Sequence, residues 1–461
     1  MTFNTGQQIA HDNFMQFASK PEQTMFALFG AAGTGKSYTS GKMLDVIRPT
    51  VTRTIAGFNG APDRTIAVPS MDEVLWLAPT WKAVRIAGSF LEGNGLTDYE
   101  IGYDAYHHTH GKLVLTTTQQ ALGLRPVIDD EQTADNVSFG RVGRGLIATL
   151  KPKWIVIDEV SMLSWDHLKA LAEACQAVGC KVLILGDPNQ LPPVKAQEIK
   201  WDRLKNRNEL TQIMRQSGDS AIPHFGRAIL DGAEWNGMTG AGLTKSTRAV
   251  SQFIEEVGRP SLIEDDRTVF IGYRNATVDR IQEAACQRVY GHSATEFAAG
   301  EIVIAQSALH SSSGMVVANQ DQLEVLSIDG RGEWGELVKV RNHAGRIVYT
   351  EYLSGADMAD PRHPYTIELK RRQNKAQALQ AAWGKNKGDR GLNERRKAAW
   401  GSFFELKART VLNFAHPFAI TSHKSQGSSY KRTFIAADEL AQFSNRSLYV
   451  AATRPKEELV Y

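Results

Sequence analysis

The eight residues from Gly30 to Ser37 read G-A-A-G-T-G-K-S and fit the phosphate-binding pattern G-x-x-x-x-G-K-[ST] at every position. Glycine at Gly30, Gly33 and Gly35 lets backbone N–H groups close around a triphosphate without Cβ clashes. Lys36 can reach the β- and γ-phosphates, and the Ser37 hydroxyl can ligate Mg²⁺. These residue types in this order predict a nucleoside-triphosphate site and leave open what the energy is used for.

Two adjacent carboxylates, Asp158 and Glu159, follow four apolar residues that read as a buried strand. Behind a phosphate loop, such a pair suits Mg²⁺ chemistry: Asp158 would hold a metal-bound water, and Glu159 would orient and deprotonate the attacking water. The loop from Gly186 to Val194 also follows an apolar strand and carries Gln190. An amide there can donate to a γ-phosphate oxygen and so sense its departure.

Two arginines, Arg215 and Arg454, follow apolar runs further along the chain. Hydrolysis that is coupled to closure of two lobes needs an arginine placed against the triphosphate, and either residue could supply it. A structural ion pair is the alternative for both.

The elements that must position these residues alternate between strands and helices. A helix is expected over Tyr38 to Ile47, and apolar strands are expected at Met25–Phe29, Val74–Ala78, Trp154–Ile157 and Lys181–Leu185. This alternation predicts a parallel sheet covered on both faces, with ligands at the carboxyl ends of its strands. A second alternating region begins near Asn208, with strands expected at 269–271, 418–420, 433–435 and 447–450.

Four insertions interrupt the alternation. Pro49 to Pro69 reads as a surface excursion, and Lys112 to Arg144 as a small hairpin subdomain. Short β-rich runs from Phe297 to Tyr352 favour a small barrel. The segment from Ile367 to Arg409 has helical composition around a break at Gly384–Gly391.

Charge is unevenly distributed along the 461 residues, which suffice for about three domains. Between Lys370 and Arg409 there are 12 basic and 3 acidic residues, a local +9 in a chain of net +3, which leaves −6 for the rest. A basic patch on a mildly acidic body is expected for a polyanion partner, and a solvated helical face is the alternative. Three cysteines without metal-ligand spacing, no membrane-span-length apolar run and no signal-peptide pattern predict a soluble intracellular protein.

The order and spacing of these motifs resemble superfamily 1 helicases of the 5′→3′ branch, which contains the phage Dda-type and bacterial RecD-type enzymes. Thr5–Ala10 resembles the adenine-reading element, with Gln7 on the adenine edge. Asp158–Met162 and the Gly186–Val194 loop match the family closely, and Tyr273–Val278 is similar to a second-lobe motif. Val450–Arg454 matches the last motif, which carries an arginine finger.

The resemblance extends to the motifs that contact DNA. Ala78–Ala83 looks like the first of them, and His108–His110 resembles the next, although His108 stands where threonine usually opens it. Thr421–Gly427 matches the motif that touches both DNA and ATP, with Gly427 on the nucleotide side. The DNA contacts implied are Pro79, Thr80, Trp81, His110, Asn189, Thr421, Ser422, His423 and Lys424. Such side chains suit single strands, which are held by phosphate contacts and stacking, while core packing is an equal alternative for Trp81.

The resemblance implies an α/β fold with two tandem RecA-like P-loop lobes. Residues 1–195 would form lobe 1 with a hairpin wedge at 112–148, in which Phe139 is the candidate to stack on the last base pair. Lobe 2 would comprise 196–300 and 410–461, and an SH3-like β-barrel with the basic helical extension would occupy 301–409.

The function implied is an ATP- and Mg²⁺-dependent DNA helicase that moves 5′→3′ along single-stranded DNA. Single-stranded and forked DNA would be its partners, together with single-stranded-DNA-binding or replication and recombination proteins. We expect a cytoplasmic monomer, in a bacterial cell or a phage-infected host, without membrane contact. A translocase that strips proteins from DNA, a non-catalytic DNA-binding subunit and RNA unwinding stay open as alternatives.

Overall fold

The computed structural model describes residues 3–47, 50–55, 64–69, 74–96, 99–102, 113–127, 138–141, 144–193, 196–214, 219–311, 314–342, 345–436 and 438–461. The chain divides into two compact units. The first comprises Met1–Lys245 and Phe443–Glu457, and the second comprises Ser246–Gln442 and Glu458–Tyr461. In the described residues, no helix combines the length and the apolar character needed to cross a membrane.

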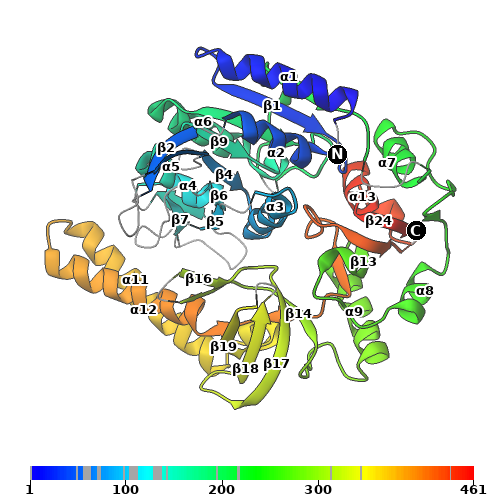
Figure 1. Ribbon diagram of the computed structural model, residues 1–461. Helices are drawn as coiled ribbons and strands as arrows, with labels where there is room; N and C mark the ends of the chain where they lie inside the picture. Colours follow the sequence, from blue (N-terminus) through cyan, green and yellow to red (C-terminus); the bar gives the residue numbers. More distant parts are fainter. Residues whose placement is uncertain are drawn as a thin grey trace. The chain divides into compact units, whose positions relative to one another are not determined.

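The first unit is built on a parallel sheet of seven strands (Figure 1). In spatial order they are β11 (Arg207–Leu210), β1 (Met25–Gly30), β10 (Lys181–Gly186), β9 (Trp154–Ile157), β4 (Val74–Ala78), β6 (Leu113–Thr117) and β5 (Tyr99–Ile101). Every neighbouring pair is parallel, and all five residues of β4 are buried, as expected for a sheet covered on both faces. The four strands predicted for this region are confirmed.

Helices cover both faces of this sheet. One face packs against α1 (Thr5–Ser19), α2 (Lys36–Ile47) and α3 (Trp81–Gly93). The other packs against α4 (Thr118–Leu122), α5 (Leu146–Leu150) and α6 (Trp165–Val178). Successive strand residues therefore alternate between these two cores, which leaves both faces of the sheet buried.

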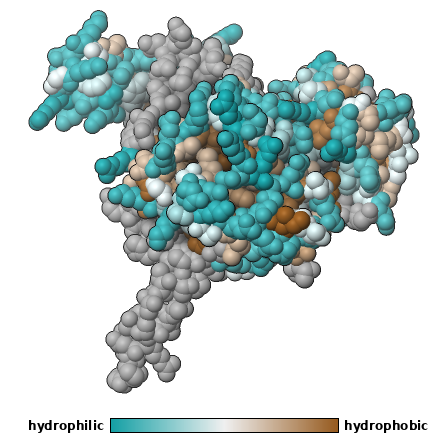
Figure 2. Space-filling view, turned by 90° about the horizontal axis from the view of Figure 1, so that it is seen from above, coloured by the Kyte–Doolittle hydropathy of each residue, from teal (hydrophilic) through white to brown (hydrophobic). Residues whose placement is uncertain are grey.

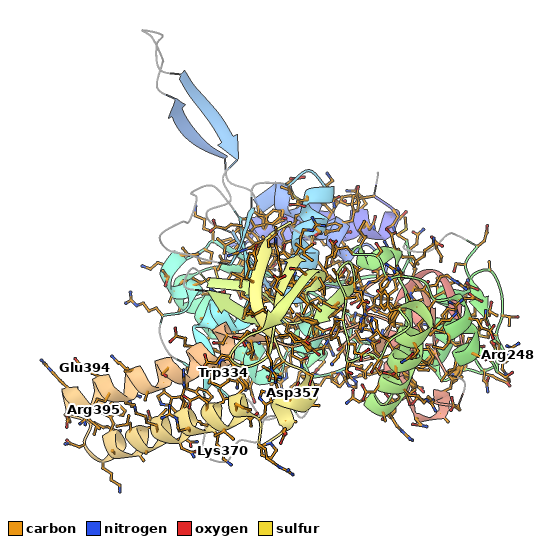
Figure 3. All side chains as sticks on the ribbon, turned by 90° about the horizontal axis from the view of Figure 1, so that it is seen from below. Arg248, Trp334, Asp357, Lys370, Glu394 and Arg395 are labelled. Carbon is orange, nitrogen blue, oxygen red and sulfur yellow. The ribbon has the colours of Figure 1, made fainter. Side chains whose placement is uncertain are left out.

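Two antiparallel ribbons project from the first unit. The predicted surface excursion contains β2 (Thr50–Ile55) paired with β3 (Arg64–Pro69), a ribbon that extends away from the sheet in Figure 3. In the region predicted as a hairpin subdomain, β7 (Leu124–Val127) pairs with β8 (Ser138–Arg141). β6 and α4, which precede this ribbon, belong to the main sheet and its cover because Leu113–Leu115 is apolar and buried.

The end of the chain departs from the predicted strand at 447–450, where the structure has the helix α13 (Asn445–Ala452). Ser444 caps this helix by accepting a hydrogen bond from the Ser447 N–H, and Pro455 begins the strand that follows. Residues Ser447–Ala452 are all buried, so the segment lacks the one-sided apolar periodicity of a surface helix and reads as a buried strand. α13 belongs to the first unit, as do α7 (Ile222–Asp231) and β12 (Leu243–Thr244). In the sheet, β12 neighbours β24 (Pro455–Val460).

The second unit contains a small parallel sheet and a barrel-like sheet. In the first, β13 (Thr268–Gly272) lies between β22 (Ala419–Thr421) and β23 (Tyr430–Phe434), and packs with α8 (Ala249–Glu256) and α9 (Asn275–Val289). The second runs in the order β20 (Val411–Leu412), β19 (Ile347–Tyr352), β18 (Glu336–Asn342), β17 (Gln322–Arg331), β14 (Ile302–Ala305) and β21 (Phe414–Ala415). A ribbon of β15 (Leu309–Ser311) and β16 (Gly314–Val317) accompanies it.

Two helices extend from the barrel-like sheet and form what we call the arm, α11 (Pro364–Lys385) and α12 (Arg390–Arg409) (Figure 1). The short helix α10 (Gly355–Ala359) precedes them. The predicted helical segment with a break near Gly384–Gly391 is confirmed, because Asp389 caps α12 directly after the turn.

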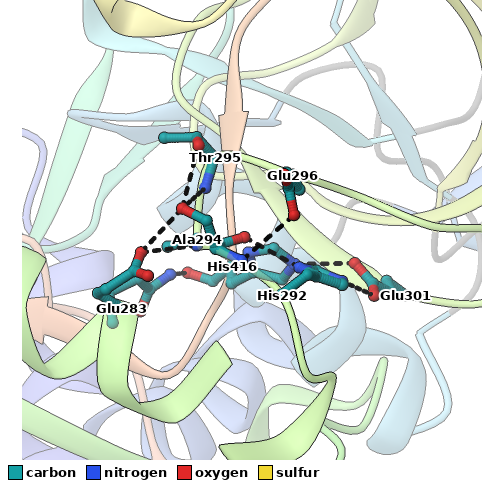
Figure 4. Close-up of polar contacts among 9 residues, drawn as sticks. Glu283, His292, Ala294, Thr295, Glu296, Glu301 and His416 are labelled. Carbon is teal, nitrogen blue, oxygen red and sulfur yellow. Dashed lines mark hydrogen bonds and ion pairs between the residues drawn. The ribbon is translucent and has the colours of Figure 1, made fainter. Parts of the chain in front are cut away.

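The chain passes between the parallel sheet and the barrel twice, and one carboxylate joins the two passages (Figure 4). Glu301 precedes β14 and is buried; its Oε1 lies 2.6 Å from His292 Nε2 and its Oε2 lies 2.9 Å from His416 Nε2. The ring of Phe297 stacks on His416, with 4.6 Å between centroids. We call His292, Glu301 and His416 the junction cluster, because it fixes the barrel to the sheet that precedes and follows it.

Candidate functional site

The phosphate loop connects the carboxyl end of β1 to α2 in the first unit. Gly33 and Gly35 have φ of 82° and 83°, a left-handed conformation that favours glycine. A Cβ on Gly30 would lie 2.7 Å from the Leu210 carbonyl oxygen, so no larger side chain fits there. Lys36 folds back over the loop, with its Nζ 2.7 Å from the Gly30 oxygen and 3.0 Å from the Ala31 oxygen. The Lys36 ammonium is thus already held at the loop that would cradle phosphate.

Gln7 lies buried against this loop, at the first turn of α1. Its side chain completes a capping box with Asn4, and its Nε2 donates to the Thr34 carbonyl oxygen at 3.3 Å. A Cβ on Gly35 would lie 2.4 Å from Gln7 Nε2, so glycine is required for this close approach. The structure therefore brings the predicted adenine reader to the phosphate loop, while its contact with a base stays a prediction.

Asp158 and Glu159 stand at the carboxyl end of β9. Burial, reinforced by the negative charge of Glu159, raises the pKa of the Asp158 carboxyl to about 7, against the opposing effects of the Glu159 N–H and of Lys36. Glu159 has a left-handed backbone with φ 48°, which is uncommon for a residue with a side chain. Among the described residues, nothing hydrogen bonds to its buried Oε2. A buried carboxylate oxygen without a partner is what a base poised for a water molecule would present.

Asp187 follows β10 in the Gly186–Val194 loop and links this loop to α13. Its Oδ1 accepts from the Asn189 N–H at 3.0 Å, and its Oδ2 accepts from the Tyr449 hydroxyl at 2.9 Å. The same Tyr449 oxygen accepts from the Ala32 N–H of the phosphate loop at 3.3 Å. Gln190, in the same loop as Asp187, is buried, and Ser161 Oγ lies 3.5 Å from its Oε1. Tyr449 therefore connects two of the three loops that the sequence singled out.

Of the two predicted arginines, Arg454 is described and Arg215 lies outside the described residues. Arg454 is buried at the end of α13, where its Nε donates to the Val450 oxygen at 2.9 Å. The last described residue before Arg215 is Met214, whose N–H donates to the Gly33 oxygen of the phosphate loop at 2.7 Å. Both chain segments that carry the arginines thus belong to the unit that holds the phosphate loop.

The predicted DNA contacts of the first unit lie at the carboxyl end of β4 and after β10. Pro79 is buried, and the exposed Thr80 caps α3 by accepting from the Ala83 N–H at 3.2 Å. Trp81 packs half-buried against the core. Asn189 is half-buried, whereas His110 lies outside the described residues.

The corresponding residues of the second unit follow β22. Ser422 is buried, and its carbonyl oxygen accepts from Ser425 Oγ at 2.7 Å. His423 and Lys424 are exposed, and Lys424 Nζ donates to Gln306 Oε1 at 3.2 Å. Thr421 begins this turn and Gly427, with φ 76°, lies in it. Exposed donors on a tight turn are suited to phosphate contacts.

For the wedge candidate Phe139, the structure describes the backbone alone: Phe139 pairs with Pro126 in the β7–β8 ribbon. Its side chain lies outside the described residues, so its role as a wedge stays a prediction.

The residues present fit a magnesium ion accompanying a triphosphate. Mg²⁺ is usually held by one or two carboxylates together with substrate phosphates and water. Ser37 at the start of α2 and Asp158 at the end of β9 would hold it, and a cation there would favour the charged form of the buried Asp158 carboxyl.

Among the described residues, Tyr449 contacts this site and was missed by motif reasoning. The residue was visible five positions before Arg454, but a tyrosine in an apolar run reads as core. What distinguishes it is a buried hydroxyl with two partners, which only the fold reveals.

Comparison with known proteins agrees with this architecture. The family model described as AAA domain matches residues 2–234, half of the chain, and the model described as UvrD-like helicase C-terminal domain matches residues 416–460. The uncharacterized protein R530 of Acanthamoeba polyphaga mimivirus is 25% identical over 219 residues, which are 46% of this chain and 39% of that relative.

Two solved structures are similar to the chain at low identity. The Pif1 helicase from Bacteroides, in complex with ADP-AlF3 and ssDNA, has a TM-score of 0.50 at 16% identity, covering 100% of this chain and 92% of that chain. The Pif1 helicase from Candida albicans has a TM-score of 0.48 at 14% identity, covering 100% and 95%. The chain belongs to the AAA-domain family, whose model matches half of it, and its carboxyl-terminal match and ordered motifs resemble superfamily 1 helicases.

Proposed function

We propose that the protein is an ATP-dependent DNA helicase that translocates 5′→3′ on single-stranded DNA and unwinds duplex DNA. One observation carries the proposal: the phosphate loop, the Asp187–Gln190 loop and the Asp158–Glu159 pair follow β1, β10 and β9, three adjacent parallel strands. Their carboxyl ends meet at one edge of the sheet, where such folds bind nucleotides.

In this proposal each residue has a distinct task. Lys36 exchanges its two carbonyl contacts for the β- and γ-phosphates, while Glu159 orients the attacking water and accepts its proton. Gln190 senses the γ-phosphate. Arg454 and Arg215 stabilise the negative charge that develops on the γ-phosphate during hydrolysis. Mg²⁺, held by Ser37 and Asp158, would supply charge neutralisation of the phosphates.

The protein would move along DNA because its two units bind the strand in alternation. Thr80 and Trp81 in the first unit and His423 and Lys424 in the second are the contacts that we propose for the sugar–phosphate backbone. Their hold would change with the state of the nucleotide, as in other motors that convert an ATP cycle into a step.

Paired variants test the assignment of the ATP site. Lys36→Ala should abolish binding of a fluorescent ATP analogue, because the ammonium that meets the phosphates is gone. Glu159→Gln should keep that binding and lower the single-stranded-DNA-stimulated ATPase kcat by about 10²- to 10⁴-fold, since only the general base is lost.

The matched control is Lys42→Ala, which removes an exposed lysine on the same helix, α2. It should leave binding and ATPase at the wild-type level. Hydrolysis by Glu159→Gln at the wild-type rate would show that this site is misassigned.

A further inference from the structure

We infer that the arm is a binding surface for the phosphate backbone of duplex nucleic acid, separate from the single-strand contacts. This inference rests on the proposed helicase function and adds a second nucleic-acid partner to it. The arm carries most of the positive charge of the segment from Lys370 to Arg409, whose local charge is +9 against −6 for the rest of the chain.

Part of this charge holds the arm together. Arg372 joins the two helices, because its Nη1 donates to the Ser402 oxygen at 3.0 Å while its Nε contacts Glu368 at 2.8 Å. Arg396 donates to Gln380 at 2.8 Å and lies 4.3 Å above the ring of Trp383. These arginines have structural partners within the arm.

Arg371 also pairs with Glu368, and Lys407 lies over the ring of Phe403, but most of the remaining basic residues have no such role. Seven of them are exposed, and in the described part of the chain no hydrogen bond or ion pair joins their side chains to another group: Lys370, Lys375, Lys385, Lys387, Arg390, Arg395 and Lys397. Figure 3 shows Lys370 on α11 and Arg395 on α12 at the outside of the helix pair. Unpaired basic side chains on a projecting element are a footprint for a polyanion.

The arm is a firm support for these charges. At its base Tyr365 is buried and packs against Trp334 of the barrel, with 6.0 Å between ring centroids. Along its length Ala376, Ala399 and Phe403 are buried between the helices. A surface fixed to the barrel can hold a ligand in a defined orientation within this unit.

Shape and chemistry favour a duplex over a single strand. The 22 residues of α11 extend about 33 Å at 1.5 Å each, close to one turn of B-form DNA. Single-strand binders add aromatic platforms for unpaired bases, whereas here Arg396 covers Trp383, and Trp400, Phe403 and Phe404 pack on one another. Figure 2 shows hydrophilic side chains on the visible end of the arm, at the left as in Figure 1.

The test neutralises four exposed residues in the full-length protein, in the variant K370Q/K375Q/R395Q/K397Q. Glutamine keeps helix propensity while it removes the charge. Binding is measured without nucleotide by fluorescence anisotropy, with a blunt 20-base-pair duplex and a 20-nucleotide oligo-dT, at 50 to 200 mM NaCl. The matched control neutralises four exposed arginines outside the arm, in the variant R227Q/R248Q/R280Q/R288Q.

We expect the arm variant to bind the duplex more weakly. Its salt dependence should be shallower by about 0.9 for each phosphate that the variant no longer neutralises, up to about 3.6 for all four substitutions. Its affinity for oligo-dT and its oligo-dT-stimulated ATPase should stay within about twofold of the wild type. The control should match the wild type on both probes.

Three outcomes would overturn the inference: an unchanged duplex affinity and salt slope, an equal loss of duplex affinity in the control, or an equal loss on oligo-dT. Absence of DNA-stimulated ATPase in the wild type would instead contradict the proposed helicase function. The two failures are distinguishable because binding is measured without ATP.

Discussion

Tyr449 shows how one hydroxyl can connect separate motifs. It is buried, donates to Asp187 and accepts from the Ala32 N–H of the phosphate loop. Burial, reinforced by the charge of Asp187, raises the pKa of the Tyr449 hydroxyl above its usual range, so it stays protonated and able to donate. The Asp187 loop and the phosphate loop are thus joined at one atom of α13, the helix that ends shortly before Arg454.

We predict that Tyr449→Phe lowers both stability and ATP hydrolysis. The change leaves Asp187 Oδ2 and the Ala32 N–H without this partner, and unsatisfied buried groups of this kind cost about 1–3 kcal/mol. For a unit of this size the unfolding midpoint should fall by about 2–4 °C per kcal/mol. Thermal unfolding and single-stranded-DNA-stimulated ATPase measure the two effects.

Tyr349→Phe is the control, because Tyr349 is 70% exposed on the barrel. Its free energy of unfolding should change by less than about 0.5 kcal/mol. Equal behaviour of the two variants would contradict the linking role of Tyr449.

The positions of residues within a motif could be predicted from the sequence, and those of residues without one could not. The phosphate loop, Asp158, Glu159 and Gln190 lie at the strand ends where the pattern placed them. A single tyrosine in an apolar run has no spacing that distinguishes a bonded hydroxyl from a packed ring. Its partners are 417 and 262 positions away in the chain, a relation that only folding creates.

At the scale of elements, the junction cluster gives the second unit a pH dependence. For His292, burial lowers the pKa, but the Ser293 carbonyl and the Glu301 carboxylate outweigh it, aided by Glu296, and the pKa is raised. For His416, burial dominates over the same carboxylate, and the pKa is lowered. One imidazole is therefore stabilised as the cation and the other as the neutral ring.

Charged His292 stabilises the fold below its unfolded pKa of about 6.5, and that contribution is lost as pH rises through its folded pKa. Neutral His416 contributes above about 6.5, and its contribution is lost as pH falls through its folded pKa.

We predict that His292→Gln lowers the unfolding midpoint most between pH 5.5 and about pH 6.5, where the charged imidazole contributes fully, and progressively less toward pH 8.5. Thermal unfolding from pH 5.5 to 8.5 measures the difference from the wild type. His224→Gln, an exposed position on α7, should show no such trend. A deficit of His292→Gln that is constant with pH would mean that the contact with Glu301 does not depend on charge.

Elements with clear periodicity were predictable, and α13 was not. A parallel sheet makes its strands apolar throughout, as in β4, where every residue is buried. α13 is buried on all sides as well, so its sequence resembles those strands. Only the cap at Ser444 distinguishes it, and a serine is common in loops.

At the scale of the whole molecule, the two compact units divide the chain in a way that local patterns do not reveal. Residues 443–457 return to the first unit through contacts such as Arg446 to Glu198 at 2.7 Å, although their neighbours in sequence belong to the second. β11 pairs with β1 in the main sheet, although the second alternating region was predicted to start there. The domain boundaries proposed from the resemblance, 195/196, 300/301 and 409/410, stay a prediction.

Directional unwinding powered by this ATP site is the core of the proposed function. Strand displacement with ATP, on duplexes that carry either a 5′ or a 3′ single-stranded tail, measures unwinding and direction together. We predict displacement from the 5′-tailed duplex, none from the 3′-tailed duplex, and none from either with Lys36→Ala. Equal displacement from both tails, or DNA-stimulated ATPase without displacement from either, would contradict the proposed function.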